Sequence, residues 1–144
     1  MASMSDYLED KFLDHMIGRA TTAYPSTGEN STLFVALLNT TAIDGWTPLS
    51  TGECAGSNYS RANVANSSSN FTNSTAGSKT NKTAITFTTD ASTGWGTIKA
   101  IAICDTSSTT TGNCLWVDDL TANVSVTTGD VVEATTGSLT ITAA

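Results

Sequence analysis

The sequence is poor in charged residues, and above all in basic ones. Its 144 residues include six lysines and arginines, thirteen aspartates and glutamates and one histidine, which gives a formal net charge of −7 at pH 7. A nucleic-acid binder needs clustered Lys and Arg to displace the counterions of the phosphates. The basic residues of this chain are scattered along the sequence, so we predict no nucleic-acid partner.

Long apolar runs are also missing. No stretch reaches the roughly 18 consecutive apolar residues that a membrane-spanning helix needs. The start, MASMSDYLEDKFLDHMIGR, is acidic and amphipathic, without the basic and apolar regions of a secretory signal. We therefore expect no membrane partner and no export signal.

Residues that commonly carry catalysis or bind metals are equally scarce. His15 is the single histidine, and no serine or cysteine lies in a G-x-S-x-G turn that would let it act as a base. A zinc site needs about four ligands at short spacings. Neighbouring carboxylates such as Asp118 and Asp119 point to opposite faces of a strand. The sequence thus predicts no catalytic residue, no metal site, no cofactor and no enzymatic activity.

Serine and threonine are abundant, and together they make up roughly a third of the chain. Threonine favours strands, and eight short segments have the composition of strands separated by turn residues. These segments are Thr32–Asn39, Tyr59–Ala65, Thr83–Thr88, Thr97–Cys104, Asn113–Val117, Asn123–Val126, Val131–Ala134 and Ser138–Thr142. They predict a mainly β protein, an antiparallel β-sandwich with jelly-roll-like topology.

Two stretches have the composition of loops. Residues 42–57 contain Pro48 and three glycines, and residues 65–82 are a low-complexity run of Asn, Ser and Thr. We expect neither stretch to contribute to the core.

One short amphipathic helix is predicted from Ser5 to Arg19, before a joint rich in turn residues. The predicted domains are therefore a helix and joint in 1–28 and the β-sandwich in 29–144. A helix of about four turns is not stable alone in water, so we expect its apolar face to dock on a partner and to lie outside the chain's own core. That face consists of Leu8, Phe12, Leu13, Met16 and Ile17. Trp46 is a further candidate for docking, and the alternative is that it plugs one end of the sandwich.

The stretch GWGTIKAIAICDTSSTTTGNCLW, residues 94–116, contains two of the three cysteines. If its two predicted strands pair as a hairpin, Cys104 and Cys114 fall near the base, where opposed side chains lie within reach of a disulfide. The two thiols are then either free or bridged, and Cys54 is left without a partner cysteine.

Nearly end to end, the chain resembles a family of small virion proteins of tailed bacteriophages, usually labelled tail-fibre-like or head-decoration proteins. The resemblance is carried, in order, by SDYLEDKFLDHMIGR, LFVALLNT, NYSRANV, TDASTGWGTIKAIAICD, GNCLWVDDLTANVSVTTGD and GSLTIT. It implies a structural protein of the virion, assembled in the host cytoplasm, with no catalytic residue.

Three functions follow as expectations. The first is a capsid decoration, or cement, protein that binds the major capsid protein and reinforces the capsid as a homo-oligomer, with a trimer favoured. An alternative is a tail-fibre or tail-adaptor protein that contacts tail components during host attachment. A second alternative is a carbohydrate-binding module, in which an exposed Trp46, Trp95 or Trp116 stacks on sugar rings.

Overall fold

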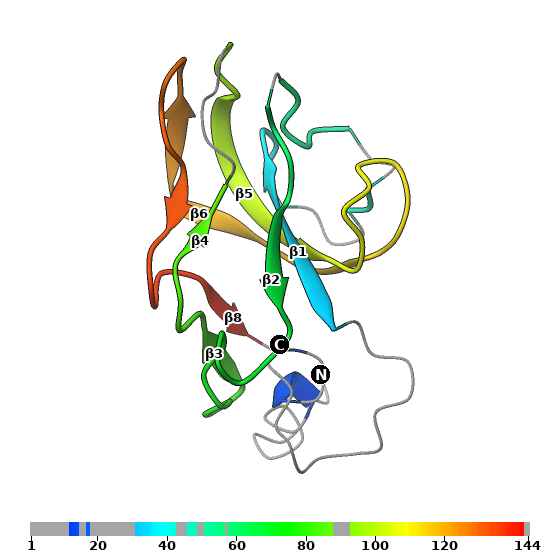
Figure 1. The fold of residues 1–144 in the computed structure, drawn as a ribbon, viewed down its shortest axis with the longest axis vertical. Helices are drawn as coiled ribbons and strands as arrows, with labels where there is room; N and C mark the ends of the chain where they lie inside the picture. The colour runs from blue at the N-terminus through cyan, green and yellow to red at the C-terminus, as the bar shows by residue number, and fades with distance from the viewer. Residues whose placement is uncertain are drawn as a thin grey trace. The chain divides into compact units, whose positions relative to one another are not determined.

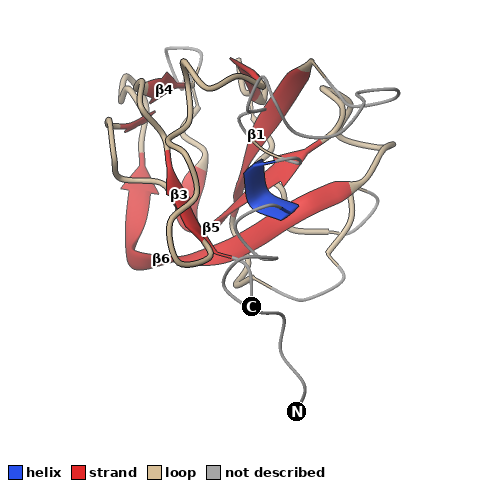
Figure 2. Cartoon of the chain, turned by 90° about the horizontal axis from the view of Figure 1, so that it is seen from below, coloured by secondary structure: helices blue, strands red, loops and turns tan. Residues whose placement is uncertain are grey.

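The computed structural model describes residues 12–14, 17, 31–42, 46–48, 51–56, 58–87 and 93–142. Strands dominate the regular structure of these ranges, and the helical piece among them is Phe12–Asp14 (Figure 2). The strands are β1 (Thr32–Leu38), β2 (Ala62–Ala65), β3 (Ser78–Thr80), β4 (Ile85–Thr86), β5 (Gly96–Cys104), β6 (Cys114–Val126), β7 (Glu133–Ala134) and β8 (Thr140–Thr142). The prediction of a mainly β protein with antiparallel pairing is confirmed.

The described chain divides into two compact units. The first unit contains the described residues among 1–31, 65–85 and 134–144, and the second contains those of 32–64 and 86–133. The division falls inside the two-residue strands β4 and β7, which pair with each other. The predicted domains, 1–28 and 29–144, stay a prediction.

The second unit is built on a four-stranded sheet with the order β2-β1-β5-β6 (Figure 1). β1 pairs antiparallel with β5, so that Phe34 lies opposite Cys104 and Leu38 lies opposite Ala100. Both central strands are buried along most of their length. A strand that is covered on both faces has a nearly continuous apolar sequence, which explains the runs TLFVALL and IKAIAIC.

β6 is one strand of 13 residues where the sequence predicts two. Its pairing with β5 shifts register between Ile98 and Ala100, and again between Ile103 and Cys104. Extra residues on one strand form a bulge, which bends the strand and interrupts the alternation of its side chains. The interruption accounts for the gap between the two predicted strands. β6 lies at one edge of the sheet.

The first unit contains a tight hairpin within the Asn/Ser/Thr-rich run. The backbone groups of Thr75 and Ser78 exchange hydrogen bonds of 3.0 and 3.1 Å. The two residues between them, Ala76 and Gly77, have φ values of 50° and 69°, as a type I′ turn requires. The returning strand, β3, then pairs antiparallel with β8.

The same run supplies core residues, contrary to the prediction that it lies outside the core. Phe71 is fully buried, and Lys79 and Asn81 are nearly so. The burial of these residues could not be recognised from the sequence, because small polar residues surround them. Buried side chains in a hairpin and its turn follow no regular spacing of apolar residues. The prediction for 65–82 is therefore wrong in this respect.

Asn81 joins the hairpin to the segment before β8. Its Oδ1 accepts a hydrogen bond from Leu139 N at 2.9 Å, and its Nδ2 donates to the carbonyls of Thr83 and Thr135 at 2.9 Å each. Its own backbone N–H donates to the Leu139 carbonyl, and its carbonyl accepts from Gly137 N. One buried amide thus satisfies backbone groups that a sheet would otherwise pair.

Part of the predicted helix is present. Phe12–Asp14 are helical, and Ile17 N donates to the Leu13 carbonyl at 2.9 Å, the spacing of an α-helical hydrogen bond. The rest of the predicted helix, with Leu8 and Met16, lies outside the described residues.

The sandwich and jelly-roll topology stays a prediction. The described strands form one four-stranded sheet and two two-stranded pairs, β3 with β8 and β4 with β7. The predicted strand Thr83–Thr88 is reduced to β4, and Val131–Ala134 is reduced to β7. The class and the pairing direction are thus shown, and the finer topology is not.

Candidate functional site

Cys104 ends β5, Cys114 begins β6, and the two residues lie directly opposite each other in the antiparallel pair. Cys104 is fully buried and Cys114 is partly buried. Both are free thiols in this structure. Cys104 belongs to the apolar cluster around Trp46, Cys114 packs against the same cluster, and the Cys114 S–H donates to the Trp116 carbonyl at 3.3 Å. The structure therefore brings the two predicted thiols together, and the bridge between them stays a prediction.

The two thiols are chemically unequal. Hydrogen-bonding interaction with Cys114 raises the pKa of Cys104, and burial acts in the same direction. The same interaction lowers the pKa of Cys114, and the nearby positive charge of Arg61 acts in the same direction. Because the thiolate is the nucleophilic form of cysteine, the directions of the two pKa shifts favour Cys114 as the nucleophile of the pair.

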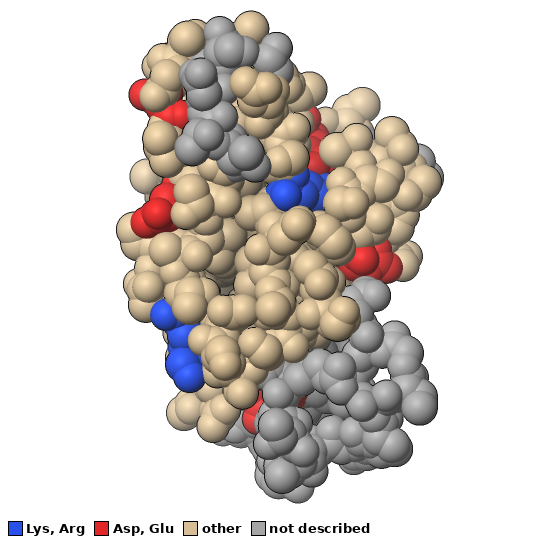
Figure 3. All heavy atoms as spheres, in the orientation of Figure 1, with Lys and Arg blue, Asp and Glu red and all other residues tan. Residues whose placement is uncertain are grey.

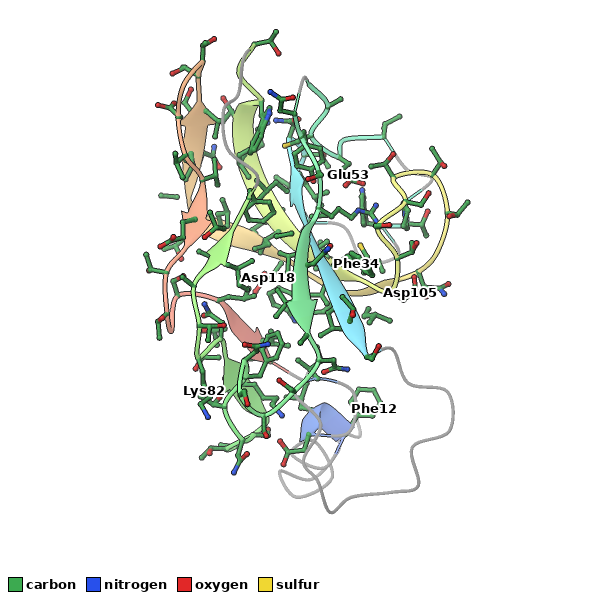
Figure 4. All side chains as sticks on the ribbon, viewed as in Figure 1. Phe12, Phe34, Glu53, Lys82, Asp105 and Asp118 are labelled. Atoms are coloured by element: carbon green, nitrogen blue, oxygen red, sulfur yellow. The ribbon has the colours of Figure 1, made fainter. Side chains whose placement is uncertain are left out.

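A buried ion pair, Glu53 with Arg61, contacts the loop that follows Cys104 (Glu53 is labelled in Figure 4). Arg61 Nε and Nη2 donate to the two Glu53 oxygens at 2.8 and 2.6 Å, and Nη1 donates to the Thr106 carbonyl at 2.8 Å. Burial alone lowers the pKa of Arg61, but the hydrogen bond to Glu53 and nearby negative charge raise it overall. The bidentate geometry satisfies two charges that would be costly to bury singly.

Tyr59 connects this ion pair to β1. Its hydroxyl donates to Glu53 Oε1 at 3.1 Å and accepts from Leu37 N at 3.0 Å. The ring packs edge-on against Trp95, with ring centroids 5.3 Å apart. Burial, followed by the charge of Glu53, raises the pKa of Tyr59. The hydroxyl therefore stays protonated and serves as a structural donor.

Cys54 has a different environment from the other two thiols. Its side chain is buried, and its backbone N–H donates to the Leu37 carbonyl at 2.9 Å. Burial and the negative charge of Glu53 raise the pKa of Cys54 to about 12. At neutral pH Cys54 is a protonated and unreactive thiol.

The loop between the two strands of the hairpin is closed by its own side chains (Asp105 is labelled in Figure 4). Asp105 accepts hydrogen bonds from the backbone N–H of Asn113 at 2.7 Å and from its Nδ2 at 2.6 Å. Gly112 has a φ of 93°, and a Cβ there would collide with the side chains of Asp105 and Thr106. These contacts keep the ends of β5 and β6 together.

Trp46 packs within the chain, with an exposed fraction of 4%. Its indole Nε1 has no hydrogen-bond partner in the part of the chain that the structure describes. The cluster that contains it consists otherwise of Ala36, Leu38, Ala100, Ala102 and Cys104. Three small alanines leave room for the indole on this face of the sheet. The stretch 42–57 thus contributes to the core, against our expectation, while docking by Trp46 stays a prediction.

The other tryptophans differ in exposure. Trp95 is buried, and Trp116 is partly exposed. Of the three indoles considered for sugar stacking, two are therefore covered by the chain itself, and Trp116 alone has a partly accessible face.

Asp14 connects the helical turn to the rest of the first unit. Lys79 Nζ donates to Asp14 Oδ1 at 2.6 Å and to the Leu13 carbonyl at 3.4 Å. The same Asp14 oxygen accepts from Ser74 N at 2.8 Å. The Lys79 side chain is 1% exposed and the Asp14 side chain is 13% exposed. A buried ammonium group thus holds the turn in place.

The residues of the predicted docking face differ in their exposure. Leu13 and Ile17 are buried within the chain, whereas Phe12 is 50% exposed. The expectation that this helix lies outside the chain's own core is wrong for Leu13 and Ile17. Docking on a partner stays a prediction, and Phe12 is the described side chain that is exposed for it.

The sequence did not predict the buried polar networks, which include Glu53, Arg61, Lys79 and Asn81. A charged residue between small polar residues resembles a solvated one, and Lys79 lies 65 positions from its partner Asp14. The available signal is scarcity: in a chain with six basic residues, Arg61 inside a predicted strand is unusual.

Within the described ranges, no group of three or more His, Cys, Asp and Glu side chains converges in a way that could hold a metal ion. None of the helical structure among the described residues is long and apolar enough to cross a membrane.

One comparison with known proteins identifies a relationship. A family model described as "Podophage GP4 fiber I protein gp80" matches residues 3–142, nearly the whole chain. No curated protein matches the sequence. The matched range includes the thiol pair and both buried ion pairs.

Proposed function

Because this chain belongs to the family of the podophage GP4 fiber I protein gp80, a family of tailed-phage virion proteins, we propose that it is a non-enzymatic structural component of the virion's tail fibre. The family match carries the proposal. Its description names a fibre and not a capsid component, so it favours the tail-fibre alternative over our first expectation of a capsid decoration protein.

The pairing of buried charges and the scarcity of charged side chains support a structural role. Glu53 and Arg61 satisfy each other, and so do Asp14 and Lys79. On the face shown in Figure 3, charged side chains form small separate patches on a mostly uncharged surface. Such a surface suits close and permanent packing against other virion proteins, because few charges must be desolvated.

We place the contact between identical copies at the second half of β6. β6 ends the strand order of the sheet, and no described strand pairs with its outer edge. Residues 120–129, LTANVSVTTG, carry no charge although the chain's net charge is −7. Val124 in this run is 47% exposed. Edge strands that must stay single are usually protected by charged residues or proline, so an unprotected edge fits a second copy of this chain in a homo-oligomer, with a trimer expected.

The fibre proposal is tested by locating the protein in the particle. Antibodies raised against the purified chain, coupled to gold and imaged on virions, should label the tail and leave the capsid shell unlabelled. Particles made without the protein should keep stable, filled heads and fail in attachment. Labelling spread over the capsid, or heads that lose DNA on mild heating, would instead establish the decoration function.

The edge contact is tested with two exposed valines. Val124 lies on β6, whereas Val131 is 63% exposed outside the strands. We expect Val124→Lys to shift sedimentation toward the monomer and Val131→Lys to leave the oligomer intact. Equal effects of the two substitutions, or a native chain that sediments as a monomer, would rule out this edge as the contact.

A further inference from the structure

We propose that Cys104 and Cys114 form an oxidisable cross-strand pair, which is converted to an intramolecular disulfide by a small-molecule disulfide such as oxidised glutathione, with Cys114 reacting first. The two residues are direct partners in the β5–β6 ladder. Opposed residues of a regular antiparallel pair hold their Cβ atoms about 4.5–5.5 Å apart, and a disulfide spans about 3.5–4.5 Å. The pair lies next to a register shift, and closing the bridge requires the two side chains to move slightly toward each other. Cys104 belongs to one apolar cluster and Cys114 packs against the same cluster, so the two side chains lie on the same face of the sheet.

Access decides the order of reaction. Cys104 has no exposed surface, whereas Cys114 is partly exposed at the start of β6. A dissolved oxidant therefore meets Cys114 first. The pKa of Cys114 is lowered by its interaction with Cys104 and by the charge of Arg61, which favours the accessible sulfur as the nucleophile.

The reaction proceeds in two exchange steps. The Cys114 thiolate attacks one sulfur of oxidised glutathione, a mixed disulfide forms on Cys114, and one glutathione thiolate leaves. Cys104 then loses its proton, and its sulfur attacks the Cys114 sulfur and releases the second glutathione thiolate. The two protein thiols lose two electrons and two protons, and oxidised glutathione becomes two molecules of glutathione.

Cys54 provides a control within the same chain. It is buried like Cys104, but it is no ladder partner of either cysteine. With a pKa raised to about 12, it is protonated at neutral pH. We therefore expect Cys54 to remain a thiol under conditions that oxidise the pair.

The bridge would cross-link the ends of β5 and β6 beneath the loop that Asp105 and Asn113 close. Its timing rests on the proposed function: a virion protein is assembled in a reducing cytosol and meets oxidising surroundings after release. Assembly would then proceed with the hairpin as dithiol, and the cross-link would form in the finished particle. The chemistry itself does not depend on where in the virion the protein lies.

The full-length chain is incubated with oxidised glutathione, alkylated, digested and analysed by mass spectrometry. We expect a peptide pair linked through Cys104 and Cys114, with Cys54 alkylated only after denaturation. The melting temperature should rise by about 5–10 °C, and dithiothreitol should reverse the rise. A pair that stays reduced in the folded chain, or Cys54 oxidised at a comparable rate, would overturn the proposal.

Three variants test the order of attack. Cys104→Ala should accumulate the mixed disulfide on Cys114, Cys114→Ser should remain unmodified, and Cys54→Ala should behave like the native chain. Mixed disulfide on Cys104 in the Cys114→Ser variant would contradict the order. If either variant fails to fold, the time course of the native chain decides, because a transient Cys114 adduct must precede the bridge. Neither result bears on gold labelling of the tail, so this proposal and the fibre proposal fail separately.

Discussion

The two units of the chain both bury an ion pair, but different interactions hold them together. In the second unit, Glu53 and Arg61 accompany a four-stranded sheet whose central strands are apolar and buried. In the first unit, β3 and β8 have three residues each, and the side chains of Lys79 and Asn81 bond to segments far away in the sequence. The second unit therefore depends mainly on strand packing, and the first depends on a few polar side chains.

The difference between the two units indicates how part of a small β protein can fold with little apolar core. A sheet buries enough apolar surface to order its backbone, and a charged pair adds little to its net stability. Short strands bury less, so each side chain that satisfies several backbone groups becomes individually important. Substitutions of polar residues should accordingly affect the two units through different mechanisms.

The largest effect is expected for Arg61→Met. The substitution removes both guanidinium hydrogen bonds from the buried Glu53 carboxylate, which keeps the bond from the Tyr59 hydroxyl, and an unpaired buried charge costs about 3–5 kcal/mol. Urea denaturation should report the loss. Adding Glu53→Leu should recover part of it, since the double variant leaves no unpaired charge at this site. A single variant as stable as the native chain would show that the pair is dispensable.

A loss of about 3 kcal/mol is expected for Asn81→Ala, because Leu139 N–H and the carbonyls of Thr83 and Thr135 lose their partner. Hydrogen exchange should speed up in 134–142 more than in β1 and β5. Asn70→Ala is the control, because that amide donates to the Ala65 carbonyl at an exposed site. Uniform loss of protection over both units would contradict the difference between them.

A smaller effect, about 2 kcal/mol, is expected for Lys79→Met. Asp14 is 13% exposed and keeps the hydrogen bond from Ser74 N, so its charge is less isolated than that of Glu53. A double-mutant cycle with Asp14→Asn, measured by denaturation, should give a coupling energy of about 1 kcal/mol or more. Additive losses would mean that the ion pair does not hold the helical turn.

The smallest effect is expected for Asp130→Asn. Asp130 accepts hydrogen bonds of 2.8 Å from the backbone N–H and hydroxyl of Thr127, which lower its pKa. A folded-state pKa below the unfolded one gives a stabilisation that is present above the unfolded pKa, about 3.9. It is lost as the pH falls through the folded pKa. Thermal melts should show the variant slightly less stable at neutral pH and equal to the native chain in acid.

The sequence predicted best what the second unit contains. β1 and β5 were found within a residue or two of their bounds, because runs such as TLFVALL have few alternatives to a buried strand. The extent of β6 was not predictable, since its bulge breaks the alternation that identifies strands. In the first unit the hairpin depends on Ala76 with positive φ, a conformation that alanine rarely adopts and no composition rule indicates.

In the candidate site, too, some contacts could be predicted from the sequence and others could not. The sequence predicted that Cys104 and Cys114 lie opposite each other, because the two strands that carry them are close in the sequence and pair as a hairpin. Arg61 and Glu53, eight positions apart in a stretch that predicts loop and strand, gave no sign that they would meet as a buried pair. Lys79 and Asp14 meet through tertiary structure alone, because no periodic pattern links positions that distant.

The placement of the basic residues has a consequence for proteolysis. Of the Lys and Arg side chains in the described ranges, Arg61 and Lys79 are buried, Lys99 is partly buried within β5, and Lys82 is exposed. A protease of trypsin specificity cuts after such residues, and it reaches a buried one only when the surrounding structure opens. Cleavage at Lys79 would therefore record openings of the first unit, and cleavage at Arg61 would record openings of the second. Each of the two units thus contains one buried cleavage site through which its opening can be followed.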